Sequence, residues 1–396
     1  MEPKIKVLFI LPEILGPGGQ ELENIGFAKS LTSDSRFEVE ILNFFNAMSI
    51  SEFDKLHQST WSFLSLKQVF LSKQFLKIFV KSKYKLNQSL ANCFRNFPQL
   101  FDSWFQEKIK NVDICFTGIS PTHLLEHLLQ LCDEMQVPFA YHETSIFHQK
   151  NHSFYSQLEK KGTFLISAQE KEEYLKKYYP DASYCTIRQW IYLGQTDFLL
   201  IPSKQPEKVR FGSVGRVDEG KNFLKILEAI SILNQKGFPV EFVLFGDGPD
   251  LSNLQNFVEE NGLEDTVTLK GAIPFDKRAT SFENFDVFIL TSNFEGGPLV
   301  ILEAMAASKP IISTLVGDVP NRVLDGLNGY TLPVSCTAEE ICLRMENYIL
   351  NKVKVKEHGM KSRELFLEKF VNHTNEEVFK ESLMKVLGRK KHVEFS

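Results

Sequence analysis

The sequence predicts an α/β protein built from two doubly wound, parallel-sheet domains. Three observations carry this prediction: the chain has 396 residues, short apolar runs alternate with helical patterns along it, and a polar, Pro-containing stretch separates two series of such units. A chain of this length is too long for one ordinary domain. Strands that alternate with helices fold into parallel sheets with helices on both faces.

The first series of units begins at the N-terminus. Residues 4–11 (KIKVLFIL) are apolar and are followed by a glycine-rich loop and a helical pattern, which predicts a buried strand, a turn and a helix. The same order of patterns returns in later segments. These segments are residues 37–45, 112–135, 137–143 and 163–179.

Residues 50–110 interrupt this order with long helical patterns and no clear strand, so we expect a helical insertion in the first domain. From Lys55 to Phe101 the chain has eight basic residues and no acidic one, interleaved with aromatic and aliphatic residues. This composition is typical of a core-facing helix with a solvated lysine face, and also of a segment that docks on an anionic membrane. Both interpretations stay open at this point.

The second series of units begins near residue 208, after the linker-like stretch IPSKQPEK. Its strand and helix patterns continue to about residue 335, and the last 60 residues are helical by pattern. We therefore expect a first domain over residues 1–200, a second over residues 201–370, and a C-terminal helix over residues 371–396 that crosses back to the first domain.

Composition excludes several classes of protein. With 45 Lys and Arg against 50 Asp and Glu, the net charge of −5 argues against a general nucleic-acid binder. The six cysteines are scattered without a C-x-x-C pair, which indicates reduced, buried thiols rather than a zinc ribbon or a disulfide framework. The apolar run at the N-terminus is too short for a signal peptide, and no stretch reaches the roughly 18 apolar residues of a spanning helix. We expect a soluble, cytoplasmic protein.

The most specific motif is EGGPLVILE, which runs from Glu295 to Glu303 after the strand-like segment FDVFILTS. Pro298 is suited to the first turn of a helix, so the motif predicts a loop followed by a helix N-terminus. In a doubly wound fold such a place is a binding crevice, where free N–H groups suit a diphosphate and two glycines let a ligand approach the backbone. The two carboxylates are placed to accept hydrogen bonds from sugar hydroxyls.

Two cations precede this motif in the chain. Arg216 ends the strand pattern VRFGSVGR, and Lys221 follows five residues later across a turn. At the tip of a neighbouring strand, an arginine fork and a lysine point charge neutralise a leaving diphosphate. The spacing of Arg216 and Lys221 is by itself a weak indication of a diphosphate site. It becomes specific in combination with the loop that carries Glu295 and Glu303.

Four segments, GSVGRVDEGKN, LFGDGPDLSNL, EGGPLVILEAMAASKPIIST and GDVPNRVLDGLNGYTLP, together resemble the donor-binding domain of the GT-B glycosyltransferases, and specifically of family 4, the group 1 glycosyltransferases. The resemblance covers residues 205–335 closely and the first domain in outline. It implies two Rossmann-like domains that face a central cleft. It also implies retaining transfer of a sugar from a nucleotide diphosphate sugar to a glycan or lipid-linked acceptor, without a cofactor or a bound metal.

The resemblance also implies roles for individual residues. His142, Glu295, Arg216 and Lys221 correspond to catalytic positions, with His142 near the transferred sugar. Glu303 corresponds to the residue that holds the ribose, and Gly18 and Gly19 to a loop that packs against the donor. The expected donor site comprises Gly18, Gly19, Arg216, Lys221, Glu295, Gly296, Gly297, Pro298, Leu299, Val300 and Glu303.

Some features depart from the family or suggest other functions. The usual Asn-Gly-Val/Ile-Asp turn before the second domain reads IRQWIYLGQTDF here. His123 and His127 stand in an H-x-x-E-H pattern, but this pair has no clear third zinc ligand. His148 and His152 are also four residues apart and are most simply part of a polar loop at the cleft near His142. A nucleotide-sugar 2-epimerase of the same architecture and a noncatalytic nucleotide- or carbohydrate-binding module remain alternatives. Peripheral contact with the inner face of the plasma membrane through residues 55–101 is a separate expectation.

Overall fold

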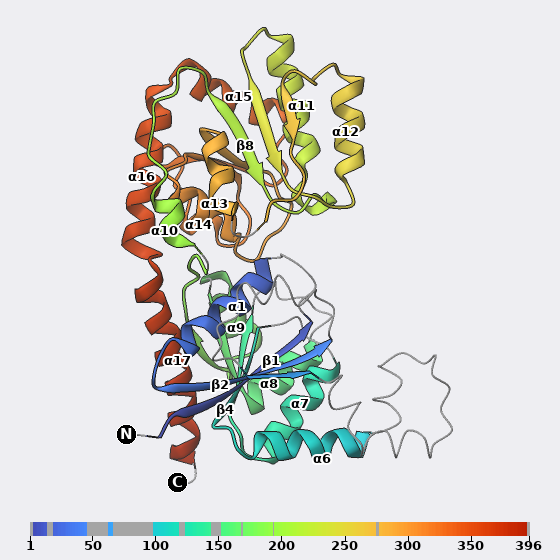
Figure 1. The fold of residues 1–396 in the computed structure, drawn as a ribbon, viewed down its shortest axis with the longest axis vertical. Coiled ribbons are helices and arrows are strands. Elements are labelled where there is room, and N and C mark those ends of the chain that lie inside the picture. Colours follow the sequence, from blue (N-terminus) through green and yellow to red (C-terminus); the bar gives the residue numbers. More distant parts are fainter. Residues whose placement is uncertain are drawn as a thin grey trace, which may run out of the picture. The chain divides into compact units, whose positions relative to one another are not determined.

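The computed structural model of the chain describes residues 3–13, 19–45, 62–65, 98–118, 123–143, 152–167, 169–192, 194–274 and 277–393. The chain divides into two compact units (Figure 1). The first comprises residues 1–167, 171–187 and 376–396, and the second comprises residues 168–170 and 188–375. The expected boundary at residue 200 thus falls inside the second unit, because residues such as Ile191 and Phe198 pack into that unit's core.

In the described part of the first unit, seven parallel strands form one sheet in the order β3-β2-β1-β4-β5-β6-β7. The order reverses between β1 and β4, which is the signature of a doubly wound sheet. The strands are β1 (Ile5–Glu13), β2 (Phe37–Phe45), β3 (Ser62–Ser65), β4 (Ile114–Thr117), β5 (Phe139–Glu143), β6 (Thr163–Ile166) and β7 (Ser183–Thr186).

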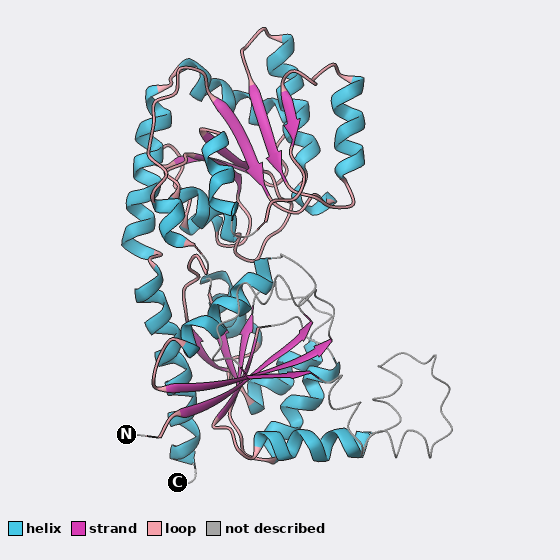
Figure 2. Cartoon of the chain, in the orientation of Figure 1, coloured by secondary structure: helices cyan, strands magenta, loops and turns pink. Residues whose placement is uncertain are grey.

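Helices flank this sheet, as Figure 2 shows. They form because their apolar residues recur at helical spacing, as in α7, where Leu125, Leu128, Leu129 and Cys132 are all buried. The helices are α1 (Gly19–Thr32), α6 (Pro98–Ile109), α7 (His123–Glu134), α8 (His152–Lys161) and α9 (Gln169–Tyr178). The last helix, α17 (Asn372–Val393), belongs to the first unit from Glu376 onward.

The expected helical insertion of residues 50–110 is described at two places only. Residues 62–65 form strand β3, which pairs in parallel with β2, so the expectation of no strand in this segment is wrong. Sheet pairing overrides the helical pattern there, because four residues are too few to show either period. Helix α6 accounts for residues 98–109 as expected. The other residues of this segment lie outside the described part of the chain.

The second unit has a six-stranded parallel sheet in the order β10-β9-β8-β11-β12-β13 in its described part. Its strands are β8 (Arg210–Val214), β9 (Glu241–Phe245), β10 (Val267–Leu269), β11 (Val287–Leu290), β12 (Ile311–Thr314) and β13 (Gly329–Leu332). Its helices are α10 (Gln195–Leu199), α11 (Phe223–Gln235), α12 (Leu251–Glu260), α13 (Arg278–Ser281), α14 (Leu299–Ala306), α15 (Ala338–Leu350) and α16 (Val353–Lys369). Short 3₁₀ turns occur at Glu219–Lys221, Phe282–Asn284 and Val319–Asn321.

The centre of this second sheet is fully buried. All four residues of β11 (VFIL) and all four of β12 (IIST) are buried, so that β12 also buries the polar side chains of Ser313 and Thr314. Helix α14 buries seven of its eight residues, from Val300 to Ala306, against the same core. The loop between β11 and α14 is therefore anchored at both ends by packed elements.

Candidate functional site in the second unit

The strand order of the second sheet reverses between β8 and β11, which lie side by side in parallel with Val287 opposite Phe211. At such a reversal the chains that leave the two strands at their carboxyl ends turn toward opposite faces of the sheet and leave a crevice for a ligand. Arg216 and Lys221 follow β8, and Glu295 follows β11. The structure thus brings the three predicted residues to the same reversal point.

Hydrogen bonds from the β11 loop fix the loop that carries Lys221. The Thr291 hydroxyl lies 3.2 Å from the carbonyl oxygen of Lys221 and 3.0 Å from that of Asn222. The backbone N–H of Asn293 donates to the carbonyl of Gly220 at 2.8 Å. Asn222 adopts a left-handed conformation with φ of 54° and ends the short turn. The two loops therefore form one connected unit.

Lys221 and Glu295 form an ion pair between the Lys221 ammonium and Oε1 of Glu295. The Ser292 hydroxyl donates to the same carboxylate oxygen at 2.7 Å. The two side chains are 23% and 14% exposed, so the pair is shielded but open on one side. Arg216, in contrast, is 74% exposed and makes a loose 3.5 Å contact with Asp218. An incoming diphosphate would meet Arg216 first and would compete with Glu295 for Lys221.

Close approaches at two glycines, Gly297 within the EGGP loop and Gly317 in the loop after β12, restrict the EGGP loop. A Cβ atom on Gly297 would lie 2.3 Å from Oε1 of Gln189. The loop after β12 packs onto the other side, where Gly317 has a φ of 49° and a Cβ would lie 2.4 Å from the carbonyl oxygen of Glu295. The EGGP loop is therefore packed against the side chain of Gln189 at Gly297 and against the backbone at Gly317.

A buried arginine holds the start of α14. Arg322 donates from Nη1 to the carbonyl of Pro298 at 3.0 Å and from Nε to Asp318 at 3.0 Å, and its Nη2 bonds the side chain of Gln189. Pro298 is the residue that precedes the first helical position, Leu299. The N–H of Ile301 donates to the carbonyl of Pro298 at 3.0 Å. The N–H groups that precede it have no acceptor one helical turn earlier, as at any helix start, and suit an anion or a hydroxyl.

Glu303 lies inside α14 and is 4% exposed. Its Oε1 accepts a hydrogen bond from Nε of Arg278 at 2.6 Å. Its Oε2 is buried and has no hydrogen-bond partner within the described residues. A buried carboxylate oxygen without a partner is costly, so this oxygen is suited to accept a hydrogen bond from a ligand hydroxyl.

His142 belongs to the first unit, at the end of β5, and is fully buried. Its Nδ1 lies 3.7 Å from Oε2 of Glu23, and the ring of Phe27 meets it edge-on at 5.0 Å between centroids. Burial lowers the pKa of His142 to about 4, while the charge of Glu23 opposes this shift and that of Lys171 adds to it. The imidazole is therefore neutral at pH 7.

The glycine loop predicted near the N-terminus is only partly described. Gly18 lies outside the described residues, and Gly19 is the exposed first residue of α1.

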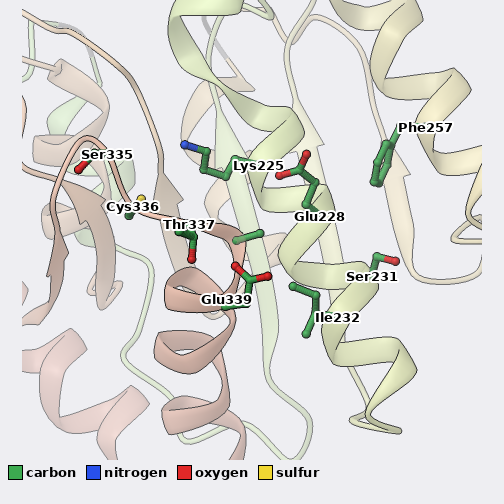
Figure 3. Close-up of a pocket in the computed structure, with 10 residues that line it drawn as sticks. Lys225, Glu228, Ser231, Ile232, Phe257, Ser335, Cys336, Thr337 and Glu339 are labelled. Atoms are coloured by element: carbon green, nitrogen blue, oxygen red, sulfur yellow. The ribbon is translucent and has the colours of Figure 1, made fainter.

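A cavity of about 550 Å³ lies elsewhere in the second unit, between α11 and the start of α15 (Figure 3). None of the predicted site residues that the structure describes lines it. The lining residues are Lys225, Glu228, Ser231, Ile232, Phe257, Ser335, Cys336, Thr337, Ala338 and Glu339.

The histidine pairs singled out in the sequence have other surroundings. His127 contacts Asp102 at 2.6 Å, His152 is the first residue of α8, and His148 lies outside the described residues. Over the described ranges, no group of three or more His, Cys, Asp or Glu side chains is arranged to hold a metal ion. No helix in this part of the chain is long and apolar enough to cross a bilayer.

Several residues of these surroundings were not expected from the sequence. Arg278, Arg322 and Gln189 reach the EGGP loop and α14 from distant segments, and Glu23 reaches His142 from α1. One signal for Arg322 was present, because the segment GDVPNRVLDG belongs to the recognised pattern. Nothing in the local sequence distinguishes Arg278 from a surface arginine.

Comparison with known proteins relates the second unit to a family of glycosyl transferases. Residues 200–364 match the family model "Glycosyl transferases group 1". The amylovoran biosynthesis glycosyltransferase AmsK of Erwinia amylovora is 29% identical over 133 residues, which cover 32% of this chain and 33% of that protein. The poly(ribitol-phosphate) alpha-N-acetylglucosaminyltransferase of Staphylococcus aureus is 26% identical over 167 residues, which cover 42% and 33%. The matches span about a third of the length of these curated relatives.

Solved structures match over nearly the whole chain. The crystal structure of HepE from Anabaena in complex with UDP and glucose has a TM-score of 0.73 at 17% identity and covers 96% of this chain and 99% of that one. At this identity the likeness establishes the fold alone. Together with the sheet orders of both units, it confirms the predicted GT-B architecture.

Proposed function

Because this chain is a GT-B protein whose residues 200–364 belong to the group 1 glycosyl transferases, we propose that it transfers a sugar from a nucleotide diphosphate sugar to a glycan or lipid-linked acceptor. We further propose that it belongs to family 4 and that transfer retains the anomeric configuration and needs no bound metal. The observation that carries the proposal is the meeting of Arg216, Lys221, Glu295 and the start of α14 at the reversal point of the second sheet.

We assign the parts of the donor to these groups as follows. The unpartnered Oε2 of Glu303 accepts hydrogen bonds from the ribose, and the first turn of α14 binds the diphosphate and the sugar through its N–H groups. Arg216 and Lys221 bind the diphosphate, and Glu295, released from Lys221, accepts hydrogen bonds from hydroxyls of the donor sugar.

The chemical step develops charge at two places. When the bond between the anomeric carbon and the diphosphate oxygen breaks, the ring becomes positive and the diphosphate becomes more negative. Preorganised cations and helix N–H groups stabilise the second charge. In the retaining reaction the acceptor oxygen bonds the same face of the ring, and a phosphate oxygen of the leaving group takes its proton. The family resemblance places His142 beside the transferred sugar, and its ring, buried in this structure, has to become accessible for that contact.

Binding to a panel of nucleotides tests this function directly. Calorimetry with UDP, GDP, ADP, TDP and CDP, without metal, is expected to give micromolar binding for one of them and at least tenfold weaker binding in Glu303→Ala. A noncatalytic module would bind a nucleotide without turnover of the corresponding nucleotide sugar. Absence of binding by all five, in a chain with an intact melting transition, would contradict the proposal.

Product analysis separates the enzymatic alternatives. Proton NMR is expected to show an α-linked product from an α-linked donor. The rate of transfer is expected to be unchanged in excess EDTA. A 2-epimerase would instead give a new nucleotide sugar without an acceptor. In His142→Ala we expect loss of transfer with nucleotide affinity nearly unchanged. Full turnover in that variant would contradict the assigned role of His142.

We also propose that the protein acts in the cytoplasm and makes peripheral contact with the inner face of the plasma membrane through residues 55–101. The support is the excess of basic and aromatic residues in this segment, most of which lies outside the described residues. Sedimentation with liposomes is expected to show binding that increases with anionic lipid content. Equal binding to neutral vesicles would remove the electrostatic part of the proposal.

A further inference from the structure

The side chain of Glu303 is held by Arg278. The two side chains are 6% and 20% exposed and are joined by the 2.6 Å bond from Nε of Arg278 to Oε1 of Glu303. A buried carboxylate is stabilised by a cation that is hydrogen-bonded to it. Arg278 supplies that cation from α13, twenty-five residues away along the chain.

The geometry of the bond leaves one carboxylate oxygen for a ligand. Only Oε1 accepts from Arg278, whereas Oε2 is buried without a hydrogen-bond partner among the described residues. Since the guanidinium is rigid and Glu303 is fixed in α14, the direction in which Oε2 points is set by this one bond. The charge of Arg278 also offsets that of Glu303, which would otherwise repel a nucleoside diphosphate.

We propose that Arg278 is a positioning residue that sets the recognition of the nucleotide's ribose hydroxyls by holding the Glu303 side chain with Oε2 directed at the ligand. The inference rests on the proposed donor site and goes beyond it, because it makes one residue outside the recognised motifs responsible for the preference for ribose over deoxyribose. Arg278 acts through Glu303 and makes no contact with the ligand itself.

The test compares matched pairs of nucleotides. Calorimetry is carried out with UDP, GDP, ADP and CDP and with the 2′-deoxy and 3′-deoxy form of each, on the full chain and on Arg278→Gln. For the nucleotide that binds wild type, removal of the hydroxyl bound by Glu303 is expected to weaken binding about 10- to 100-fold, as for a hydrogen bond to a charged group. In Arg278→Gln the ratio of ribo to deoxy affinity is expected to fall below about threefold.

Two further variants separate positioning from structural support. Arg278→Lys keeps the charge and is expected to restore part of the discrimination, since a lysine supplies the cation without the fork. Lys277→Gln removes an exposed charge from the adjacent position and is expected to leave the ratio unchanged. If Arg278→Gln fails to fold, the comparison of Arg278→Lys with wild type carries the test.

The outcomes distinguish this inference from the proposed function. If no nucleotide binds wild type, the donor site itself is refuted. If a nucleotide binds wild type but wild type does not discriminate against its deoxy forms, the positioning role of Arg278 is refuted and the donor site stands. The same conclusion follows if Arg278→Gln and Arg278→Lys keep the wild-type ratio of ribo to deoxy affinity while total affinity falls.

Discussion

At the scale of single residues, the candidate site of the second unit contains charged side chains that are paired with an opposite charge. Glu295 is paired with Lys221, Glu303 with Arg278, and Asp318 with Arg322. Arg322 differs from the others because its side chain is fully buried and bonds backbone as well as side chains. We therefore expect its loss to affect folding more than that of any surface charge.

Substitution of Arg322 by Ala is expected to lower the free energy of unfolding by about 3–5 kcal/mol, because it leaves the buried Asp318 without its cation and the Pro298 carbonyl without its donor. Urea unfolding followed by circular dichroism measures this change. The control is Lys208→Ala, which breaks an exposed pair with Glu241 and is expected to cost less than about 1 kcal/mol. Similar losses in the two variants would contradict the holding role of Arg322.

At the scale of elements, the loop between β11 and α14 is shaped by neighbouring loops rather than by its own sequence. The β8 loop is bonded to it through Thr291, and the β12 loop packs on it at Gly317. The first contact is made by the Thr291 hydroxyl and the second by backbone atoms, so a change in either neighbouring loop is expected to move Glu295.

Gly317→Ala is expected to destabilise the second unit and to weaken nucleotide binding about tenfold or more. The new methyl group combines a left-handed backbone with a clash against the Glu295 carbonyl. Gly262→Ala is the matched control, because Gly262 has a φ of 61° and no atom within 4 Å of the added Cβ. Gly262→Ala is expected to lower the free energy of unfolding only by the cost of a left-handed backbone with a side chain, about 1–2 kcal/mol. Equal binding by both variants, measured by calorimetry, would show that Gly317 does not shape the loop.

At the scale of the whole molecule, the stability of the chain depends on pH through its buried histidines. Burial is the main cause that lowers the pKa of both His142 in the first unit and His358 in the second. For His142 the folded-state pKa of about 4 lies below its ordinary value of 6.5. Between these values the unfolded chain binds a proton that the folded chain excludes, so stability is present above pH 6.5 and is lost as pH falls toward 4.

Between pH 7 and pH 4 we expect His142 to lower the free energy of unfolding by about 3 kcal/mol, a value that follows from the size of its pKa shift. Urea unfolding of wild type and His142→Gln across this range measures it, and the variant is expected to have the smaller slope with pH. His373→Gln, at an exposed histidine, is the control and should keep the wild-type slope. An unchanged slope in His142→Gln would contradict the burial of the neutral ring.

The sequence by itself determined the parallel-sheet units and pointed to the motifs of the candidate site. The segment of residues 37–45 appears as a strand with the predicted bounds. Its buried residues Phe37, Val39 and Ile41 alternate with polar ones, and this period of two is visible in the local sequence. Lys221 and Glu295, predicted separately from two motifs, lie in contact because both follow strands that meet at the reversal of the sheet.

Only the tertiary structure decided which distant residues complete the site. Arg278 and Glu303 are 25 residues apart, and Gln189 and Arg322 are 133 apart, so no local period or spacing relates them. Strand β3 escaped prediction for a similar reason, since its four residues form a strand only by pairing with β2. The orphaned oxygen of Glu303 and the burial of His142 are properties of packing. They depend on which segments the fold brings together, and local sequence does not encode that information.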